Sequence, residues 1–338
     1  MADMRTAILR AAQAADRLHK EFDTKTYTDG EAGRINVFDM MATRDLPVVF
    51  RPLDKLLGAY LDLGSPGVMI TTQRQLPVQR FTAAHELGHA ELGHTPSLDP
   101  EDILMRSPFG ARVAGGYDLQ EIQANAFASQ LLLPSWLLAK HVRRHGWTPE
   151  NLVEADTVYQ LSLRVGASYA ATCHALYSSR IIKKAAYDDL LAVKPKTIKK
   201  RLLDPYEPEN YYGDVWMITE RDDGLLLEGS RSDLVVINVL EHSGSGYLWR
   251  IEDLAEVGLA VVSDGRSDPH NREAIGGMVF RTVVAKSGEG AIGHVNLREV
   301  RPWMAADPLH SLNLEVDFTG PVQAGLLQAQ REALLGVV

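Results

Sequence analysis

The stretch from Arg80 to His94 constrains this chain more than any other. Its centre reads HELGH, which has the pattern His-Glu-X-X-His, and no proline interrupts the stretch, so we expect one helix. On a helix, His85 and His89 stand one turn apart on the same face, where both imidazoles can reach a single metal ion. Glu86 points about 100° further round. Its carboxylate is therefore placed to hold and deprotonate a water molecule at that metal.

The surroundings of this motif separate a metal site from a chance match. With 11 histidines and 44 acidic residues in 338, the pattern arises by chance in roughly one such chain in a hundred. Chance copies would lie on polar surface helices, whereas this one is surrounded by Phe81, Ala83, Ala84, Leu87, Ala90 and Leu92. Gly88 costs the helix about 1 kcal/mol relative to alanine, which indicates that another element packs close to it. We therefore favour a metal site in a cleft over a structural histidine pair.

A third ligand decides the class of site. The continuation after His89 lacks the glycine and histidine of the metzincin pattern, which disfavours that class. A second helix, rich in alanine and leucine, is expected from Glu121 to Pro134. On it Glu121 and Asn125 stand one turn apart, so that a carboxylate could bind the metal while an amide orients a ligand imidazole. The alternative is an N-terminal glutamate that is favoured only by the helix dipole.

His85, His89 and Glu121 would form a His-His-Glu ligand set that leaves a fourth position for water. Such a set is typical of catalytic rather than structural zinc. Peptide hydrolysis also needs a group that stabilises the oxyanion of the tetrahedral intermediate. Four side chains have suitable chemistry, and nothing in the sequence assigns one of them: His94, Tyr117, His174 and Tyr177.

These motifs carry a family resemblance. The run RFTAAHELGH at 80–89, followed by Glu121 and by ANAFASQLLLP at 124–134, resembles the ImmA/IrrE family of bacterial metallopeptidases. The similarity extends over roughly residues 32–190, about half of the chain. It implies an intracellular, gluzincin-like protease that cleaves a helix-turn-helix repressor and so switches on stress-response or mobile-element genes. It also implies that Glu86 is the general base and that the three ligands bind zinc.

Composition sets broad limits on the rest. A chain of 338 residues with 45% hydrophobic content is long enough for about two domains. The net charge of −9 argues against a protein whose main role is to coat nucleic acid. The single cysteine, Cys173, excludes an internal disulfide and suits a reducing compartment. No signal peptide or long apolar run is found, so we expect a cytoplasmic protein without a membrane anchor.

A zinc metallopeptidase domain is expected over residues 1–150. Besides the two helices of the site, it should contain an amphipathic helix at 4–22, a second helix at 33–42 and a small sheet from β-prone runs at 47–50, 58–61 and 67–71. An edge strand of that sheet could bind a peptide substrate by β-augmentation, or the sheet could be purely structural. Between His94 and Tyr117 the many prolines and glycines predict a loop over the cleft.

A helical unit with a linker is expected over residues 151–204. Residues 158–177 have the helix, glycine-containing turn and second helix of a helix-turn-helix. The run from Arg180 to Arg201 holds eight basic residues, a pattern that could also contact DNA. Because the chain as a whole is acidic and a turn pattern alone is weak, we favour a unit that supports the protease and expect no DNA binding.

From residue 205 onward, alternating strands replace alanine-rich helix, and we expect a β-sandwich over residues 205–338. Six runs have strand character, at 215–218, 234–239, 247–251, 259–262, 278–284 and 294–300. Turn signals recur between them at short intervals, which favours a sandwich of about a hundred residues. A closing helix is expected from Leu326 to Leu335.

Three short motifs in this region look like the recognition loops of the chagasin family, immunoglobulin-like inhibitors of papain-type cysteine proteases. They are GYLW at 246–249, Gly-Gly at 276–277 and Arg-Pro-Trp at 301–303. The resemblance, over roughly residues 212–303, implies loops gathered at one end of an immunoglobulin-like sandwich.

Partner-contact candidates on these loops are Tyr247, Trp249, Arg301 and Trp303. The segment HSGS at 242–245 departs from the Asn-Pro-Thr-Thr of that family and argues against inhibition of cysteine proteases. The alternative is that Trp249 and Trp303 are simply core residues of the sandwich.

Together these patterns predict an α+β chain: a gluzincin-like zinc metallopeptidase core, a helix-turn-helix-like extension and an all-β sandwich. The function that fits best is a zinc-dependent endopeptidase acting on one protein partner, by resemblance a repressor, with the sandwich docking the substrate or gating the cleft. The alternatives are a DNA-binding transcriptional regulator with a residual zinc site and a protein-binding adaptor. An intact Glu86 favours the enzyme, because a residual site has no need of a base. The oligomeric state is not determined by the sequence.

Overall fold

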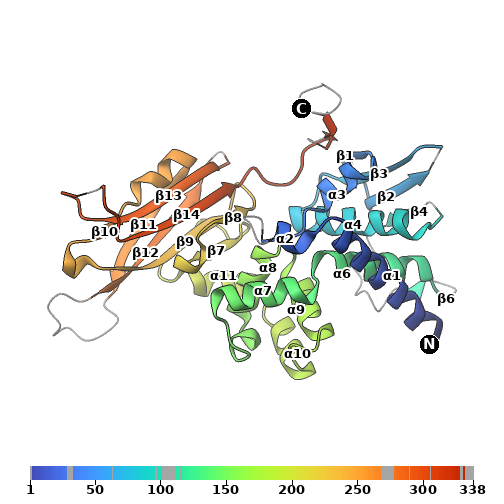
Figure 1. Ribbon diagram of the computed structural model, residues 1–338, viewed down its shortest axis with the longest axis horizontal. Helices are drawn as coiled ribbons and strands as arrows, with labels where there is room; N and C mark the ends of the chain where they lie inside the picture. The colour runs from blue at the N-terminus through green and yellow to red at the C-terminus, as the bar shows by residue number, and fades with distance from the viewer. Residues whose placement is uncertain are drawn as a thin grey trace.

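The computed structural model describes residues 2–28, 33–62, 64–95, 97–100, 112–113, 116–267, 278–288, 290–304, 306–327 and 330–331. It shows a mixed α+β protein in two parts that lie side by side (Figure 1). One part consists of helices around a small sheet, and the other is β-rich. Among the described residues, no helix combines the length and apolar character needed to cross a membrane.

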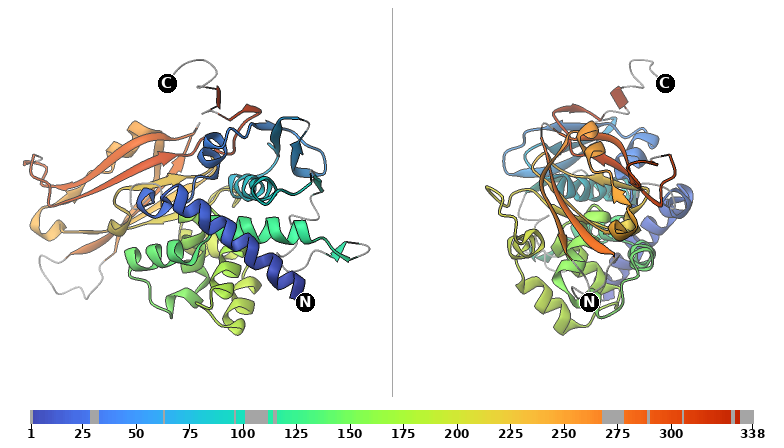
Figure 2. Two further views of the ribbon diagram at one scale, coloured as in Figure 1. Left: turned by 45° about the vertical axis from the view of Figure 1, so that its right-hand side comes forward. Right: turned by 90° about the vertical axis from the view of Figure 1, so that its left-hand side faces the viewer.

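The helical part carries the expected helices and sheet. Its helices are α1 (Ala2–Glu21), α2 (Thr24–Tyr27), α3 (Val37–Thr43), α4 (Leu76–Leu92), α6 (Leu119–Leu132), α7 (Ser135–His145), α8 (Ala155–Arg164), α9 (Tyr169–Ser178), α10 (Lys184–Ala192) and α11 (Pro195–Leu203). Its strands follow the order β15-β1-β3-β2-β4. They are β1 (Val48–Arg51), β2 (Leu56–Asp62), β3 (Pro66–Thr71), β4 (Ser97–Pro100) and β15 (Gly325–Leu326). The amphipathic α1 lies across α6 (Figure 2).

Helix α4 contains the whole His-Glu-X-X-His motif, as the sequence predicts. A proline in its first turn suits the start of a helix, and Gly93 ends it in the left-handed region at φ 66°. In the middle of α4, a Cβ added at Gly88 would lie 3.0 Å from the ring of Phe127 on α6. The glycine is therefore required for α4 and α6 to pack this closely.

Helix α6 also forms as predicted, starting two residues before Glu121. Asp118 caps it by accepting a hydrogen bond from the backbone N–H of Gln120 at 2.9 Å. The helix ends at Leu132, just before Pro134, which then precedes α7. Glu121 thus lies in the first turn, where a negative charge is favoured by the helix dipole.

Helices α8 and α9 form the expected helix-turn-helix, with Gly166 at φ 68° in the turn. The basic run that we expected to join two domains instead contains helix α11. Within it Lys199 is buried and forms an ion pair with Asp214 at 2.9 Å. One hydrophobic core extends from α1 through α4, α6, α8 and α9 to Ile198 on α11.

The β-rich part consists of two four-stranded sheets that share a hydrophobic core. One sheet has the order β10-β13-β14-β8, from β8 (Leu225–Glu228), β10 (Leu248–Trp249), β13 (Ile292–Val300) and β14 (His310–Asp317). The other has the order β11-β12-β9-β7, from β7 (Val215–Ile218), β9 (Leu234–Glu241), β11 (Leu259–Ser267) and β12 (Val279–Ser287). All six runs predicted as strands form strands. Sequence reasoning missed β8, β14 and β15. It also expected only a loop between His94 and Tyr117, which is wrong in part: β4 pairs with β2 there, and β5 (Arg112–Val113) pairs with β6 (Gly116–Tyr117).

The two parts meet where the edge strand β7 docks on α8. The side chain of Gln160 donates to the carbonyl of Val215 at 2.8 Å and accepts from the N–H of Met217 at 2.9 Å. An amide side chain thereby replaces a neighbouring strand along part of β7. This pairing satisfies backbone groups that an edge strand would otherwise expose.

A buried ion cluster fastens the same junction. Asp222 lies 2.7 Å from Arg164 on α8 and 2.9 Å from His145 on α7. Burial alone would raise the pKa of Asp222, but the Arg164 guanidinium and His145 outweigh it and hold that pKa below its usual range. The contact therefore requires an ionised Asp222, and the two parts are joined by more than a chain connection.

The C-terminal segment returns to the helical part. Leu326 was expected to begin a closing helix, and this prediction is wrong: it lies in β15, which pairs antiparallel with β1 (Figure 1). Gln330 then accepts from the N–H of Val48 at 3.0 Å. The open edge of β1 offers hydrogen bonds that a helix at Leu326 could not use. Leu327 is not helical, Gln330 and Arg331 are, and residues 328, 329 and 332–335 of the expected helix lie outside the described residues.

Candidate metal centre

The structure brings His85, His89 and Glu121 together between α4 and α6. The Nε2 atoms of the two histidines are 3.1 Å apart and lie 3.3 and 3.4 Å from the two carboxylate oxygens of Glu121. All three side chains are buried. Metal–ligand bonds of about 2.0–2.1 Å in a tetrahedral arrangement separate the ligand atoms by about 3.3 Å. The spacing of this group therefore fits a zinc-sized ion, which it could hold with three protein ligands.

Asn125 orients the first imidazole, as the sequence predicts for a residue one turn after Glu121. Its Oδ1 lies 3.1 Å from Nδ1 of His85, inside the helix pair. Because an amide oxygen only accepts, Nδ1 of His85 carries the proton. The lone pair of Nε2 is then directed at the position between the three ligands.

The second imidazole is oriented by His94, which the sequence offered only as a possible oxyanion group, and by Gln123, which sequence reasoning missed. Nδ1 of His89 lies 3.0 Å from Nδ1 of His94, whose Nε2 lies 3.1 Å from Oε1 of Gln123. Gln123 accepts from His94, and His94 in turn accepts from His89, which leaves Nε2 of His89 free of a proton. Burial lowers the pKa of His94 and keeps it neutral, as an acceptor must be. The sequence feature that could have indicated this contact is Gly93, which ends α4 and turns the chain so that His94 lies back against the helix.

Glu86 is fully buried on α4, directly beside β2. A Cβ added at Gly58 on β2 would lie 2.5 Å from Oε1 of Glu86 and 2.4 Å from Cγ2 of Thr82. Only glycine allows the strand to pass this close to the carboxylate. A glycine inside a β-prone run was a visible signal of close approach, but the sequence alone does not say what approaches.

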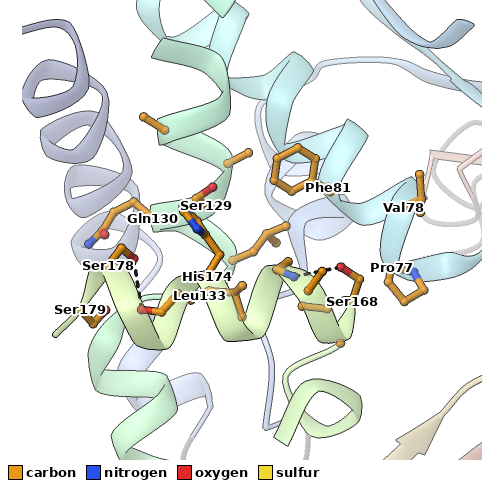
Figure 3. A pocket seen from close by; sticks show the side chains of 18 of the residues that line it. Pro77, Val78, Phe81, Ser129, Gln130, Leu133, Ser168, His174, Ser178 and Ser179 are labelled. Carbon is orange, nitrogen blue, oxygen red and sulfur yellow. Dashed lines mark hydrogen bonds between the residues drawn. The ribbon is translucent and has the colours of Figure 1, made fainter. Parts of the chain in front are cut away.

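A cavity of about 710 Å³ lies next to this centre, between α1, α4, α6 and α9. Figure 3 shows Phe81 and Val78 from α4 on one side of it, and on another side His174 and Ser178 from α9 with Ser168, which caps that helix. Its wall is mostly apolar, and burial lowers the pKa of His174. Thr82, one turn before Glu86, also lines it, so the cavity reaches the helix that carries the base.

The four partner-contact candidates on the sandwich separate into two kinds. Trp249 is only 3% exposed and belongs to the core, so the structure places it out of reach of a partner. Trp303 is 74% exposed and packs over Gly246. The guanidinium of Arg301 lies 4.4 Å from the centre of the Tyr247 ring. The predicted loop at 276–277 lies outside the described residues.

Comparison with known proteins identifies the helical part. Residues 42–177 match the model of the IrrE N-terminal-like domain, a peptidase family. These residues form an IrrE N-terminal-like domain. The match includes His85, His89 and Glu121, together with the base candidate. The predicted ImmA/IrrE resemblance is therefore confirmed, with a buried His-His-Glu group of metal-binding geometry inside the domain.

Two curated relatives cover different shares of the chain. Amoebiasin-2 of Entamoeba histolytica is 26% identical over 106 residues, which are 31% of this chain and 86% of that protein. An uncharacterized immunity region protein 2 of Bacillus phage phi105 is 30% identical over 88 residues, which are 26% of this chain. That second match spans about half of the phage protein, 51% of its length.

Solved structures also match, among them the following two. The crystal structure of the cysteine protease inhibitor EhICP2 from Entamoeba histolytica is 25% identical, with a TM-score of 0.29, and covers 32% of this chain and 99% of that one. The solution structure of amebosin is 18% identical, with a TM-score of 0.22, and covers 30% of this chain and 95% of that one. By its sequence match to amoebiasin-2, the C-terminal part of the chain resembles the amoebiasin group of chagasin-like inhibitors, as predicted.

Proposed function

We propose that this chain is a zinc-dependent endopeptidase that hydrolyses a peptide bond in one specific protein partner. The observation that carries the proposal is the buried group of His85, His89 and Glu121, whose ligand atoms lie 3.1–3.4 Å apart. Two imidazoles and one carboxylate leave a position for water in a tetrahedral site, which is the donor set of catalytic zinc. The match to a peptidase family supports the same conclusion.

Each residue has a distinct role in this proposal. Zinc, when held by the three ligands, supplies a Lewis acid that polarises the scissile carbonyl and acidifies water. Glu86 accepts the proton of the attacking water and then passes it to the leaving amine. Its complete burial beside Gly58 strengthens this proton transfer, because bulk water does not compete for the carboxylate. Asn125 and His94 hold the two imidazoles in the tautomers that a metal requires.

The proposed substrate is a helix-turn-helix transcriptional repressor. The ImmA/IrrE resemblance supports this choice, and the phage relative is named as an immunity region protein. A gluzincin-like core and an intracellular site of action belong to the same proposal.

The rival function, DNA binding through α8 and α9, is disfavoured by the chemistry of the helices. In a helix-turn-helix the second helix reads the major groove, yet α9 carries no lysine or arginine and packs largely in the core. Much of the nearby basic charge is already paired: Lys184 with Asp188, Lys199 with Asp214 and Arg201 with Asp156. We infer that this unit supports the peptidase domain.

The sandwich docks the substrate in this proposal, rather than covering the peptidase cleft. Figure 1 places β10, which follows the Tyr247 loop, at the end of the sandwich away from α4 and α6. A loop at that end cannot lie over the metal centre of the same chain. The exposed Trp303 is instead an aromatic anchor suited to a protein partner. Partner binding through this surface, which the adaptor alternative assumed, would then bring the substrate to the peptidase domain.

The test is incubation of the zinc-loaded chain with candidate helix-turn-helix repressors, followed by intact-mass analysis. We expect one pair of fragments whose masses add up to the repressor plus one water molecule, and no fragments with Glu86→Gln. If the loaded chain cleaves unstructured peptides but none of the repressors, the substrate proposal is wrong. If it cleaves neither, with zinc bound at His85, His89 and Glu121, the peptidase proposal itself is wrong.

A further inference from the structure

The end of the sandwich that carries β10 has a layer of charge where its strands should be apolar. Residues facing the core alternate along each strand, and three strands present runs of core residues: Val235, Ile237 and Val239 on β9, Val295 and Leu297 on β13, and Leu312, Leu314 and Val316 on β14. One more step of two residues along each run leads to Glu241 on β9, Glu299 on β13 and, toward the start of the strand, His310 on β14. Glu241 and Glu299 are both fully buried.

The negative charges of the two buried glutamates are compensated by different partners. Glu241 lies 2.6 Å from Arg266 and 3.0 Å from Arg281, two side chains that are always charged. Within the described part of the chain, the ion pairs of Glu299 are with His242 and His310 only. A histidine, unlike an arginine, carries no permanent positive charge. A buried carboxylate without a permanent positive partner is costly, and a bound cation would offset that cost.

The three residues around Glu299 lie close enough together to share a metal ion, which would displace the hydrogens that the two Nδ1 atoms donate to the carboxylate. Its two oxygens lie 3.1 Å from Nδ1 of His242 and 2.7 Å from Nδ1 of His310. One ligand atom from each of the three residues lies within 4.8 Å of the others. Glu299 is also held in place, because the backbone N–H of His242 donates to it at 2.6 Å. His310 is half exposed, so an ion can enter from that side.

We propose that His242, Glu299 and His310 form a second metal site, and that its ion is Zn²⁺. Two imidazoles and one carboxylate are ligands that zinc accepts, and they leave a fourth position on the solvent side. The ion supplies the positive charge that Glu299 lacks. This site lies outside the IrrE N-terminal-like domain, and it does not depend on the proposed peptidase function.

The consequence is a clamp between the two sheets. His242 follows β9 in one sheet, while Glu299 and His310 are cross-strand neighbours in the other. Zinc would join the segment before Tyr247 to the segment that ends in Trp303, the exposed aromatic residue of this surface. The metal would therefore set the relative position of the two loops that the docking surface uses.

The test is a count of zinc per chain in the untagged full-length protein, using variants of each site. We expect about two ions in the wild type. His310→Ala and His89→Ala should each retain only one, and the double variant none. His310 is half exposed, so its replacement should leave the fold intact. His294→Ala is the matched control, because His294 is an exposed histidine on the same strand as Glu299. Equal zinc in His310→Ala and wild type would overturn the proposal.

A second measurement separates a metal ion from protonated histidines as the source of charge. In His89→Ala, added Zn²⁺ should raise the Tm, and Co²⁺ should give the visible absorption of a low-coordinate nitrogen–oxygen site. Both effects should vanish on adding His310→Ala. If the protein is stabilised only by lowering the pH, and zinc changes neither signal, the cluster works by protonation and the proposal is wrong. Neither readout requires peptidase activity.

Discussion

Two groups of two histidines and one glutamate lie in the described part of the molecule, one between α4 and α6 and one at the far end of the sandwich. In the first, both imidazoles come from one helix and present Nε2, because Asn125 and His94 occupy their Nδ1 atoms. In the second, the ligands come from three separate strand ends, and the imidazoles present Nδ1 directly to Glu299. The composition of the two groups is the same, but their surroundings are not.

This difference distinguishes a proposed catalytic metal site from a proposed structural metal site that links two sheets. The first group has an orienting partner for each imidazole and a buried carboxylate, Glu86, on the same helix. Such orientation fixes the tautomer and tunes the metal, which a catalytic ion needs. In the second group the neighbouring buried carboxylate, Glu241, is paired with Arg266 and Arg281 instead, and the group joins two sheets. Histidine and glutamate counts alone would not distinguish the two.

The largest expected effect tests the base. Glu86→Gln should reduce peptide cleavage on the order of a thousandfold, because an amide cannot accept the proton of the attacking water. Zinc content should stay unchanged at both groups. Glu91→Gln is the matched control, since Glu91 lies on the same helix and pairs with Arg44 at 3.0 Å. Undiminished turnover in Glu86→Gln would mean that another group acts as base.

The next effect tests the orienting partners that only the first group possesses. Asn125→Ala should weaken zinc binding there by about ten- to a hundredfold, because His85 loses the acceptor that fixes its tautomer. The affinity of the group at Glu299 should not change, and it serves as an internal control in a competition titration. An equal loss at both groups would indicate general unfolding and contradict the assignment.

A third effect tests the close approach of β2 to Glu86. Gly58→Ala should destabilise the protein by about 1–3 kcal/mol, because the added Cβ collides with Glu86 and Thr82. Gly67→Ala on the neighbouring strand β3 should cost much less, since its nearest neighbour would be 3.7 Å away. Urea unfolding of the two variants measures the difference. Equal stabilities would show that β2 does not pass as close to the carboxylate as described.

A fourth effect concerns the docking surface beside the second group. Trp303→Ala should slow cleavage of the protein partner by roughly tenfold, the loss expected for one aromatic anchor, and leave hydrolysis of short peptides unchanged. Tyr212→Ala is the control, because Tyr212 is 80% exposed but lies before β7. Faster hydrolysis of short peptides in Trp303→Ala would instead show that the sandwich covers the cleft.

The smallest effect concerns the basic run between the two regions. Lys194→Gln and Lys196→Gln should change stability by less than about 0.5 kcal/mol and leave proteolysis intact, because both side chains are exposed. Lys199 is excluded from this set, since it is buried against Asp214. Sequence-selective binding of duplex DNA by the wild type, with a steep salt dependence, would contradict the supporting role of this unit.

Local periodicity explains what could be predicted of the candidate site. His85 and His89 share a helix face because four residues make about one turn, and the same rule relates Glu121 to Asn125. The strand runs could be located for an equally local reason, since β-branched and aromatic residues cluster within each run. The identity of the helical domain followed from two such local motifs in the correct order.

The remaining features depend on which faces meet in three dimensions. The sequence by itself determined the pairing of His85 with His89, the place of Glu121 and the strand-rich character of the second half. Tertiary structure alone decided that His94 orients His89, that β15 returns to β1, and that His242 and His310 meet at Glu299. The physical reason is that the first set rests on the repeat of a single element. The second set rests on packing between elements far apart in the chain, which leaves no periodic signal in the sequence.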